Sequence, residues 1–154
     1  MSLTNNDTLL QVNNLKKYFP TPHGLLYAVD NVSFNINKGD TLGVVGESGC
    51  GKSTLGRSIL RLHEPTAGEV IFEGENILSL NHAQMKHMRK DMQLIFQDPY
   101  ESLNPRMTVS QAIQAPMLIQ GMYKSKDKAA LEKRTLEMMD MVGLARRIVN
   151  SYPH

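Results

Sequence analysis

The chain of 154 residues contains one cysteine, Cys50, and no tryptophan. A single cysteine cannot form an intramolecular disulfide, which excludes the small secreted domains that depend on disulfides for stability. The N-terminus also lacks the basic segment followed by an apolar stretch that is typical of a secretory signal peptide. These absences indicate a protein that works in the reducing interior of the cell.

Long apolar runs and a large excess of one charge are absent as well. No apolar run approaches the ~20 residues that a helix needs to cross a bilayer. The 17 lysines and arginines against 15 acidic residues give a net charge of +2, too balanced for binding driven mainly by nucleic-acid phosphates. Hydrophobic residues make up 41% of the chain and charged residues 21%, which excludes disordered and collagen-like proteins. We expect a globular domain, or part of a larger one, that does not bind nucleic acid.

The residues before position 46 predict strands and turns. Val32, Phe34 and Ile36 alternate with polar residues at the period of a half-buried strand. The following Lys38-Gly39-Asp40 predicts a turn. Residues 41–45 (TLGVV) are nearly all apolar, a pattern typical of a strand that is covered on both faces of a parallel sheet.

A glycine-rich segment at residues 46–51 comes next, and a helix is predicted after it. Apolar residues recur there at helical spacing, two arginines lie outside the apolar face, and Pro65 and Gly68 should close the helix. The apolar positions are Leu55, Ile59 and Leu62, and the arginines are Arg57 and Arg61. The local order is therefore strand, glycine loop, helix.

The elements predicted between residues 69 and 105 are short. They are a strand at 69–73, a turn at 74–76, a helix at 82–90, a buried strand at 92–96 (MQLIF) and a proline-containing loop at 99–105. We expect residues 41–45 and 92–96 to belong to one parallel core sheet.

Two further helices are predicted toward the end of the chain. Thr108 and Gln111 have the spacing of a capping box, and Pro116 should end or kink the helix that they begin. A longer helix at 125–142 should stop at Gly143, which predicts a left-handed cap. One side of this helix carries Leu131, Met138, Met139 and Val142.

Residues 46–53 match the phosphate-binding P-loop, with two glycines separated by four residues and followed by lysine and serine. Glycines let backbone N–H groups approach phosphate oxygens closely, and the helix start adds the positive end of its dipole. We expect Lys52 to reach the β and γ phosphates of a nucleotide, the Ser53 hydroxyl to ligate Mg²⁺, and Thr54 to contact the α phosphate. The residues of this candidate site are Gly46, Glu47, Ser48, Gly49, Cys50, Gly51, Lys52, Ser53 and Thr54. The alternative is a glycine turn at a helix start that binds nothing, but the flanking strand and helix favour nucleotide binding.

Four segments are together similar to one known family. They are Tyr18-Phe19, GESGCGKST at 46–54, PTAGEVIFEG at 65–74 and LIFQDPYESLNPRMTV at 94–109. With them the chain resembles the ATPase subunits of ATP-binding cassette (ABC) transporters, in the dipeptide and oligopeptide importer branch. The resemblance implies an α/β fold of the P-loop NTPase type: an antiparallel β-subdomain, an incomplete parallel core sheet with the P-loop, and the start of a helical subdomain. The domains would be residues 1–98, the nucleotide-binding part, and residues 99–154, part of the helical subdomain.

The resemblance also implies roles for single residues toward ATP and Mg²⁺. Tyr18 takes the place of the A-loop aromatic that stacks on adenine; the alternative is a strand-end aromatic packed on the core. Gln97 matches the Q-loop glutamine, which contacts Mg²⁺ and the attacking water. Lys52 and Gln97 are therefore the candidate catalytic residues, and Ser53 and Gln97 the candidate metal ligands. Asp98 is not assigned to Mg²⁺, because Gln97 interrupts the apolar run that a Walker B strand needs.

In this family the sequence Tyr-Pro-His leads into a signature motif, a Walker B strand with a catalytic glutamate, and a switch histidine. None of these occurs within the 154 residues. Because phosphoryl transfer depends on the whole set of groups, we expect this polypeptide to bind ATP without efficient hydrolysis. We expect it to be the N-terminal part of a longer ATPase.

The expected function is that of an ATP-binding importer subunit, which couples ATP binding and hydrolysis to uptake of di- or oligopeptides. It would lie peripherally on the cytoplasmic face of the bacterial inner membrane. Its expected partners are the membrane permease subunits, contacting Gln97 to Arg106, and a second ATPase subunit, identical or different. Two alternatives stay open: a non-catalytic nucleotide-binding or docking fragment, and a soluble ABC ATPase acting on nucleic acid, which the balanced charge disfavours.

Overall fold

The structure, a computed structural model, describes residues 7–98 and 102–153. The chain forms two compact units, the first ending at Leu94 and the second beginning at Ile95. Pro99, with which the predicted 99–105 loop begins, and His154 lie outside the described residues. In the part of the chain that the structure describes, no helix is both long enough and apolar enough to span a bilayer.

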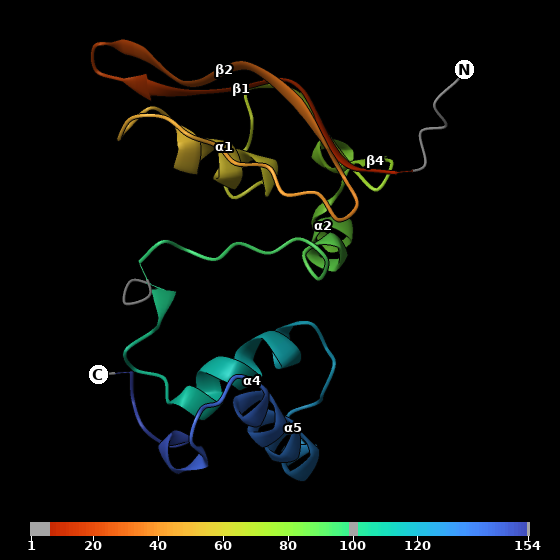
Figure 1. Ribbon diagram of the computed structural model, residues 1–154, viewed down its shortest axis with the longest axis vertical. Coiled ribbons are helices and arrows are strands. Elements are labelled where there is room, and N and C mark those ends of the chain that lie inside the picture. The colour runs from red at the N-terminus through yellow and green to blue at the C-terminus, as the bar shows by residue number, and fades with distance from the viewer. Residues whose placement is uncertain (1–6, 99–101, 154) are drawn as a thin grey trace. The chain divides into compact units, whose positions relative to one another are not determined.

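The first unit is built on an antiparallel sheet (Figure 1). Strands β1 (Thr8–Thr21) and β2 (Gly24–Asn37) form a long hairpin, and β3 (Ala67–Phe72) and β4 (Glu75–Asn76) extend the sheet in the order β2-β1-β3-β4. In β2 the apolar residues from position 32 onward are half-buried and the polar residues between them exposed. This confirms the strand predicted from alternation and the antiparallel subdomain predicted from the family resemblance.

Helix α1 (Lys52–Ile59) lies along the hairpin and closes the core of the first unit (Figure 1). The short helices η1 (Ile77–Ser79) and α2 (His82–Met88) follow β4. Leu55 and Ile59 of α1 pack against a cluster of buried apolar side chains from the sheet and from residues 77–92. The buried members of the cluster are Leu10, Val12, Leu15, Val70, Phe72, Ile77, Leu80, Met85 and Met92.

The two segments predicted as parallel core strands, residues 41–45 and 92–96, do not form strands. Both are irregular. Residues 41–45 are exposed, with Val45 at 93%, and in the second segment Ile95 is 95% exposed, whereas Met92 is buried in the core. A strand that is apolar on both faces becomes ordered only when it pairs with neighbours and is covered by other elements. No described strand pairs with either segment, so the prediction of strand at these positions is wrong for this structure.

Helix α1 ends earlier than its apolar pattern predicted. It stops at Ile59, and Arg61 adopts a positive φ of 50°. Leu62, predicted on the buried face, is 49% exposed. Arg61, predicted outside the apolar face, is instead largely buried and donates hydrogen bonds from Nη1 to the carbonyls of Ile77 and Leu80 at 2.7 and 2.9 Å. The guanidinium binds these two carbonyls of the η1 turn, and the positive φ of Arg61 cannot continue a right-handed helix.

Small boundary shifts separate the other predicted elements of the first unit from the observed ones. The strand predicted at 69–73 is observed as β3, residues 67–72, and the turn occupies residues 73–74, since Glu75 and Asn76 pair with β3. The helix predicted at 82–90 is observed as α2, which ends two residues earlier. Asn81 and Gln84 form a capping box at its start, which explains why this boundary agrees.

The second unit contains helices α4 (Val109–Ile119) and α5 (Lys128–Met141) and the short η2 (Arg146–Ile148). The predicted capping box of Thr108 and Gln111 is confirmed. Pro116 does not end α4, which continues for three residues beyond it. Gly143 has a φ of 71°, as the predicted left-handed cap requires.

The buried face of α5 differs from the predicted one. Its buried residues are Leu131, Thr135 and Met139, spaced four apart, whereas Met138 and Val142 are exposed. Thr135 replaces an apolar residue in this row because its hydroxyl is satisfied: it donates to the carbonyl of Leu131 and accepts from Gln114 of α4. The α4–α5 contact is therefore partly polar.

An ion pair joins the end of α5 to η2 in the second unit. Two of the three guanidinium nitrogens of Arg146, Nε and Nη2, donate to the carboxylate of Asp140. This hydrogen-bonded partner lowers the pKa of Asp140 below its usual range. The Asp140 contribution to folding is thus present at neutral pH and is lost as the pH falls through that lowered pKa.

Candidate functional site

The glycine-rich segment 46–51 is an exposed loop that leads directly into α1. A turn closes it, with the Cys50 N–H donating to the Glu47 carbonyl at 3.3 Å. Gly49 and Gly51 have φ angles of 81° and 97°, a region that residues with a Cβ rarely adopt. The local conformation therefore needs glycine at these two P-loop positions.

The start of α1 presents free backbone donors. The first bond within the helix runs from the Leu55 N–H to the Gly51 carbonyl at 2.8 Å, so the N–H groups of residues 52–54 have no acceptor inside the helix. Within the described residues no side chain caps this end, and its first turn contains no acidic residue. Together with the helix dipole, these donors make the position favourable for an anion.

Lys52 places its charge over the same loop. Its Nζ donates to the carbonyls of Gly46 and Glu47 at 2.8 and 2.6 Å and lies 3.6 Å from the Cys50 Sγ. The side chain folds back across the loop from the first position of α1. A phosphate that contacted the helix start would meet this ammonium group.

The P-loop approaches the sheet closely at Gly51. A Cβ atom on Gly51 would lie 2.1 Å from the carbonyl oxygen of Ala28 in β2. Only a residue without a side chain allows this backbone approach. The loop and the hairpin are therefore in direct contact at Ala28.

Tyr18 lies on β1 in this same region of the hairpin, paired with Tyr27 of β2. The two rings are 4.5 Å apart between centroids at 63°, and the Tyr18 hydroxyl donates to Asp30 Oδ1 at 2.5 Å. This hydrogen bond raises the pKa of the Tyr18 phenol to about 12. Tyr18 also donates from its backbone N–H to the Thr66 hydroxyl at 2.9 Å.

Three of these contacts were missed by the sequence reasoning. Tyr27 and Asp30 lie in no motif, and Thr66 lies in the 65–74 segment without a role of its own; they reach Tyr18 only through the register of β1 with β2 and through the chain returning after α1. A local pattern in the sequence cannot reveal such pairs. The P-loop was found because its residues are contiguous.

Gln97 belongs to the second unit, where it lies in an exposed bend. The neighbouring Asp98 accepts a hydrogen bond at its carbonyl from the Ser102 hydroxyl at 2.6 Å. The other candidate residues all lie in the first unit. The assignment of Gln97 to the nucleotide site therefore stays a prediction from sequence.

The chemistry of the donor set suits magnesium that is shared with a nucleotide. Residues 7–98 and 102–153 contain no group of three histidine, cysteine or acidic side chains that could hold a metal alone. Ser53 offers an exposed hydroxyl in the first turn of α1. Mg²⁺ commonly binds through one or two protein oxygens together with phosphate oxygens and water, which is the arrangement that this position permits.

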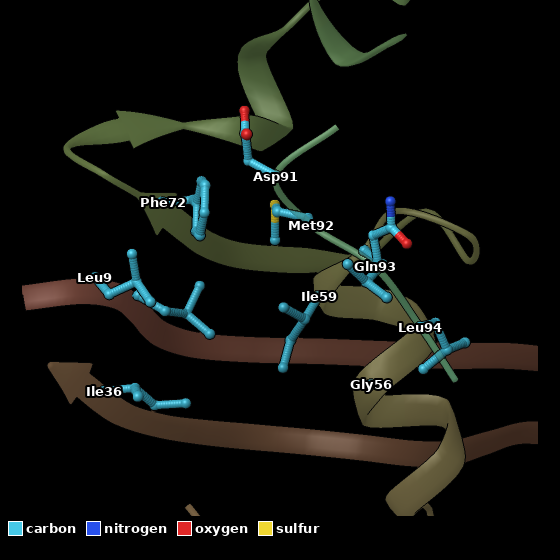
Figure 2. A pocket seen from close by; sticks show the side chains of 11 residues that line it. Leu9, Ile36, Gly56, Ile59, Phe72, Asp91, Met92, Gln93 and Leu94 are labelled. Atoms are coloured by element: carbon cyan, nitrogen blue, oxygen red, sulfur yellow. The ribbon is translucent and has the colours of Figure 1, made fainter. Parts of the chain in front are cut away.

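An apolar cavity of about 320 Å³ also lies in the first unit, between α1, the sheet and residues 91–94 (Figure 2). Its walls include Leu9, Ile36, Ile59 and Phe72, and among its lining residues only Asp91 is charged. None of the P-loop residues 46–54 lines it. A triphosphate needs donors and positive charge, so the P-loop is the better candidate for a nucleotide.

Residues 29–154 match the family model described as ABC transporter. The oligopeptide transport ATP-binding protein OppF of Bacillus subtilis is 49% identical over 149 residues, which cover 96% of this chain and 48% of that protein. The glutathione import ATP-binding protein GsiA of Pectobacterium atrosepticum is 44% identical over 155 residues, covering 96% of this chain and 24% of that protein. The chain thus spans about half the length of OppF.

A solved structure has the same fold. The dimeric, post-hydrolysis structure of the ATP-binding cassette MJ0796, bound to ADP and Pi, superposes with a TM-score of 0.78 at 28% identity, covering 94% of this chain and 62% of that chain. This confirms the predicted fold class and the family resemblance. With its P-loop, its antiparallel hairpin and a family match that covers most of its length, the chain belongs to the ABC transporter family.

Proposed function

We propose that this chain binds MgATP at the P-loop. The observation that carries the proposal is the start of α1, where free N–H groups, the Lys52 ammonium and two positive-φ glycines converge on one exposed loop. Lys52 would contact the β and γ phosphates, and the backbone N–H groups of residues 46–54 would bind the phosphate oxygens. Thr54 would contact the α phosphate.

Mg²⁺ would be held by Ser53 and Gln97, and it would neutralise charge on the phosphates. Tyr18 would stack on adenine, because its ring lies on the hairpin near the point where the P-loop touches β2. Lys52 and Gln97 are the proposed catalytic residues. In this proposal residues 1–98 are the nucleotide-binding part and residues 99–154 part of the helical subdomain.

In the whole protein, we propose that ATP binding and hydrolysis drive uptake of di- or oligopeptides. The names of the curated relatives, oligopeptide and glutathione import ATP-binding proteins, support an importer. The partners would be membrane permease subunits, contacting the region from Gln97 to Arg106, and a second ATPase subunit. The protein would then lie peripherally at the cytoplasmic face of the inner membrane.

Isothermal titration with ATP in the presence of Mg²⁺ tests the binding proposal directly. We expect one ATP bound for each chain, and binding of inorganic tripolyphosphate to the same site with lower affinity, because tripolyphosphate lacks the adenine contact. ATP should compete with tripolyphosphate. Absence of any heat of binding for both ligands, with a folded protein by circular dichroism, would reject the proposal.

Replacing Tyr18 by alanine tests the adenine contact. Stacking of a base on an aromatic ring is worth roughly 1–3 kcal/mol, so Tyr18→Ala should weaken ATP binding about tenfold in the same titration. The control is Tyr123→Ala, which removes a half-buried tyrosine of the second unit. Equal losses of affinity in the two variants would contradict the role given to Tyr18.

Chemical labelling of Cys50 tests the P-loop placement without any substitution. Cys50 is exposed in the loop and is the sole cysteine of the chain. A maleimide should label it readily, and saturating MgATP should slow the labelling at least about tenfold, because the phosphates would cover the loop. The extent of labelling is measured by intact mass. Labelling that is indifferent to MgATP would place the nucleotide elsewhere.

A further inference from the structure

The Tyr18 side chain is held by two residues of the neighbouring strand. Its hydroxyl donates to Asp30 Oδ1 at 2.5 Å, and its ring meets the Tyr27 ring at 4.5 Å in an edge-to-face arrangement. Tyr27 and Asp30 are both on β2, three residues apart. The ring and the hydroxyl end of Tyr18 are therefore both fixed to one strand.

A β-bulge makes this arrangement possible. Lys17 pairs with Val29 whereas Tyr18 pairs with Tyr27, so β2 has one extra residue, Ala28, at this step. In a regular strand, residues three apart point to opposite faces. The extra residue changes the alternation locally and redirects side chains, which lets Tyr27 and Asp30 both reach Tyr18.

The P-loop meets β2 at the same bulge. The Gly51 backbone approaches the Ala28 carbonyl so closely that a Cβ would lie 2.1 Å from that oxygen. Ala28 lies between the two residues that hold Tyr18. The orientation of the aromatic ring and the position of the phosphate loop are thus both set by residues 27–30 of β2.

We propose that Asp30 is a positioning residue of the nucleotide site, whose carboxylate holds the Tyr18 ring in the orientation that stacks on adenine. The inference rests on the proposed function of MgATP binding. A tyrosine on a strand has more than one accessible rotamer, and a charge-assisted hydrogen bond is among the stronger ways to select one. Asp30 acts through Tyr18, so its loss should affect binding of the base and leave phosphate binding intact.

Titration of the full 154-residue chain with two ligands measures this effect. Asp30→Ala should weaken ATP binding about fivefold, part of the value of a base–aromatic stack, and leave the affinity for tripolyphosphate unchanged. Tyr18→Phe, which keeps the ring and removes the hydroxyl, should lose a similar factor. The double variant should lose no more than either single variant, because both remove the same contact. The matched control is Glu75→Gln, an exposed acid on β4 at the opposite edge of the sheet.

Tyrosine ionisation gives a readout that needs no nucleotide. The hydrogen bond to Asp30 raises the Tyr18 pKa from 10.0 to about 12, so wild-type Tyr18 stays protonated when an ordinary tyrosine ionises. Near-ultraviolet absorbance of Asp30→Ala should show one additional tyrosinate between these two pH values. The bond stabilises the fold below the unfolded-state pKa of 10.0, and this contribution is lost as the pH rises toward about 12.

The outcomes separate the inference from the function on which it rests. If wild-type protein binds ATP, and Asp30→Ala and Tyr18→Phe bind it equally well, the positioning role is overturned and the nucleotide site stands. If Asp30→Ala loses ATP and tripolyphosphate by the same factor, Asp30 supports the fold and not the ring, and the inference is again overturned. If the wild type binds neither ligand, the proposed function fails and the inference fails with it.

Discussion

Replacing Lys52 by alanine is expected to weaken binding of MgATP about a hundredfold. The Nζ atom lies 2.8 and 2.6 Å from the carbonyls of Gly46 and Glu47, so the positive charge is held over the loop that would receive the phosphates. Removing one partner of a close, charge-assisted pair commonly costs ~2–5 kcal/mol, and a hundredfold change lies within this range. Isothermal titration of the wild type and the variant measures it.

The fold should tolerate the loss of Lys52. The residues that it contacts lie in an exposed loop, and surface substitutions usually change the free energy of unfolding by no more than about 0.5 kcal/mol. Lys86→Ala is the matched control, because Lys86 is an exposed lysine in the last turn of α2 and should leave ATP affinity unchanged. If Lys52→Ala bound ATP within threefold of the wild type, with an unchanged unfolding transition, the phosphates would have to bind elsewhere.

The features that could be predicted from sequence are those whose causes lie within a few residues. The P-loop depends on its own glycines, two of which adopt the positive φ angles that the motif requires. The capping box of Thr108 and Gln111 and the left-handed cap at Gly143 also depend on neighbours in the chain, and both are observed. Each of these signals carries its physical reason in the residue types themselves.

The features that were predicted wrongly or missed depend on partners distant in sequence. Residues 41–45 and 92–96 have the composition of buried strands, but a strand requires neighbours for its backbone groups, and no described strand supplies them. At the early end of α1, Arg61 binds carbonyls 16 and 19 residues away. The contact of Tyr18 with Asp30 depends on a bulge in the hairpin register. None of these can be read from local periodicity.

Replacing Gly51 by alanine is expected to destabilise the first unit by about 2–4 kcal/mol, because two costs add. The φ angle of 97° is unfavourable for any residue with a Cβ. The new Cβ would also lie 2.1 Å from the Ala28 carbonyl oxygen, a backbone atom that no side-chain rotation can move away. The P-loop would have to separate from β2, so ATP affinity should fall together with stability.

Gly56→Ala provides the opposite expectation on the same helix. Gly56 lies inside α1 with an ordinary helical φ, and nothing lies within 4 Å of the position of an added Cβ. Alanine is the better helix former by roughly 0.5–1 kcal/mol, so this variant should raise the free energy of unfolding in urea by about that amount. The two glycines are five positions apart, and only their backbone angle and their neighbours differ. Equal changes in the free energy of unfolding for the two substitutions would contradict the close approach of Gly51 to the Ala28 carbonyl, and with it the contact between the P-loop and the hairpin.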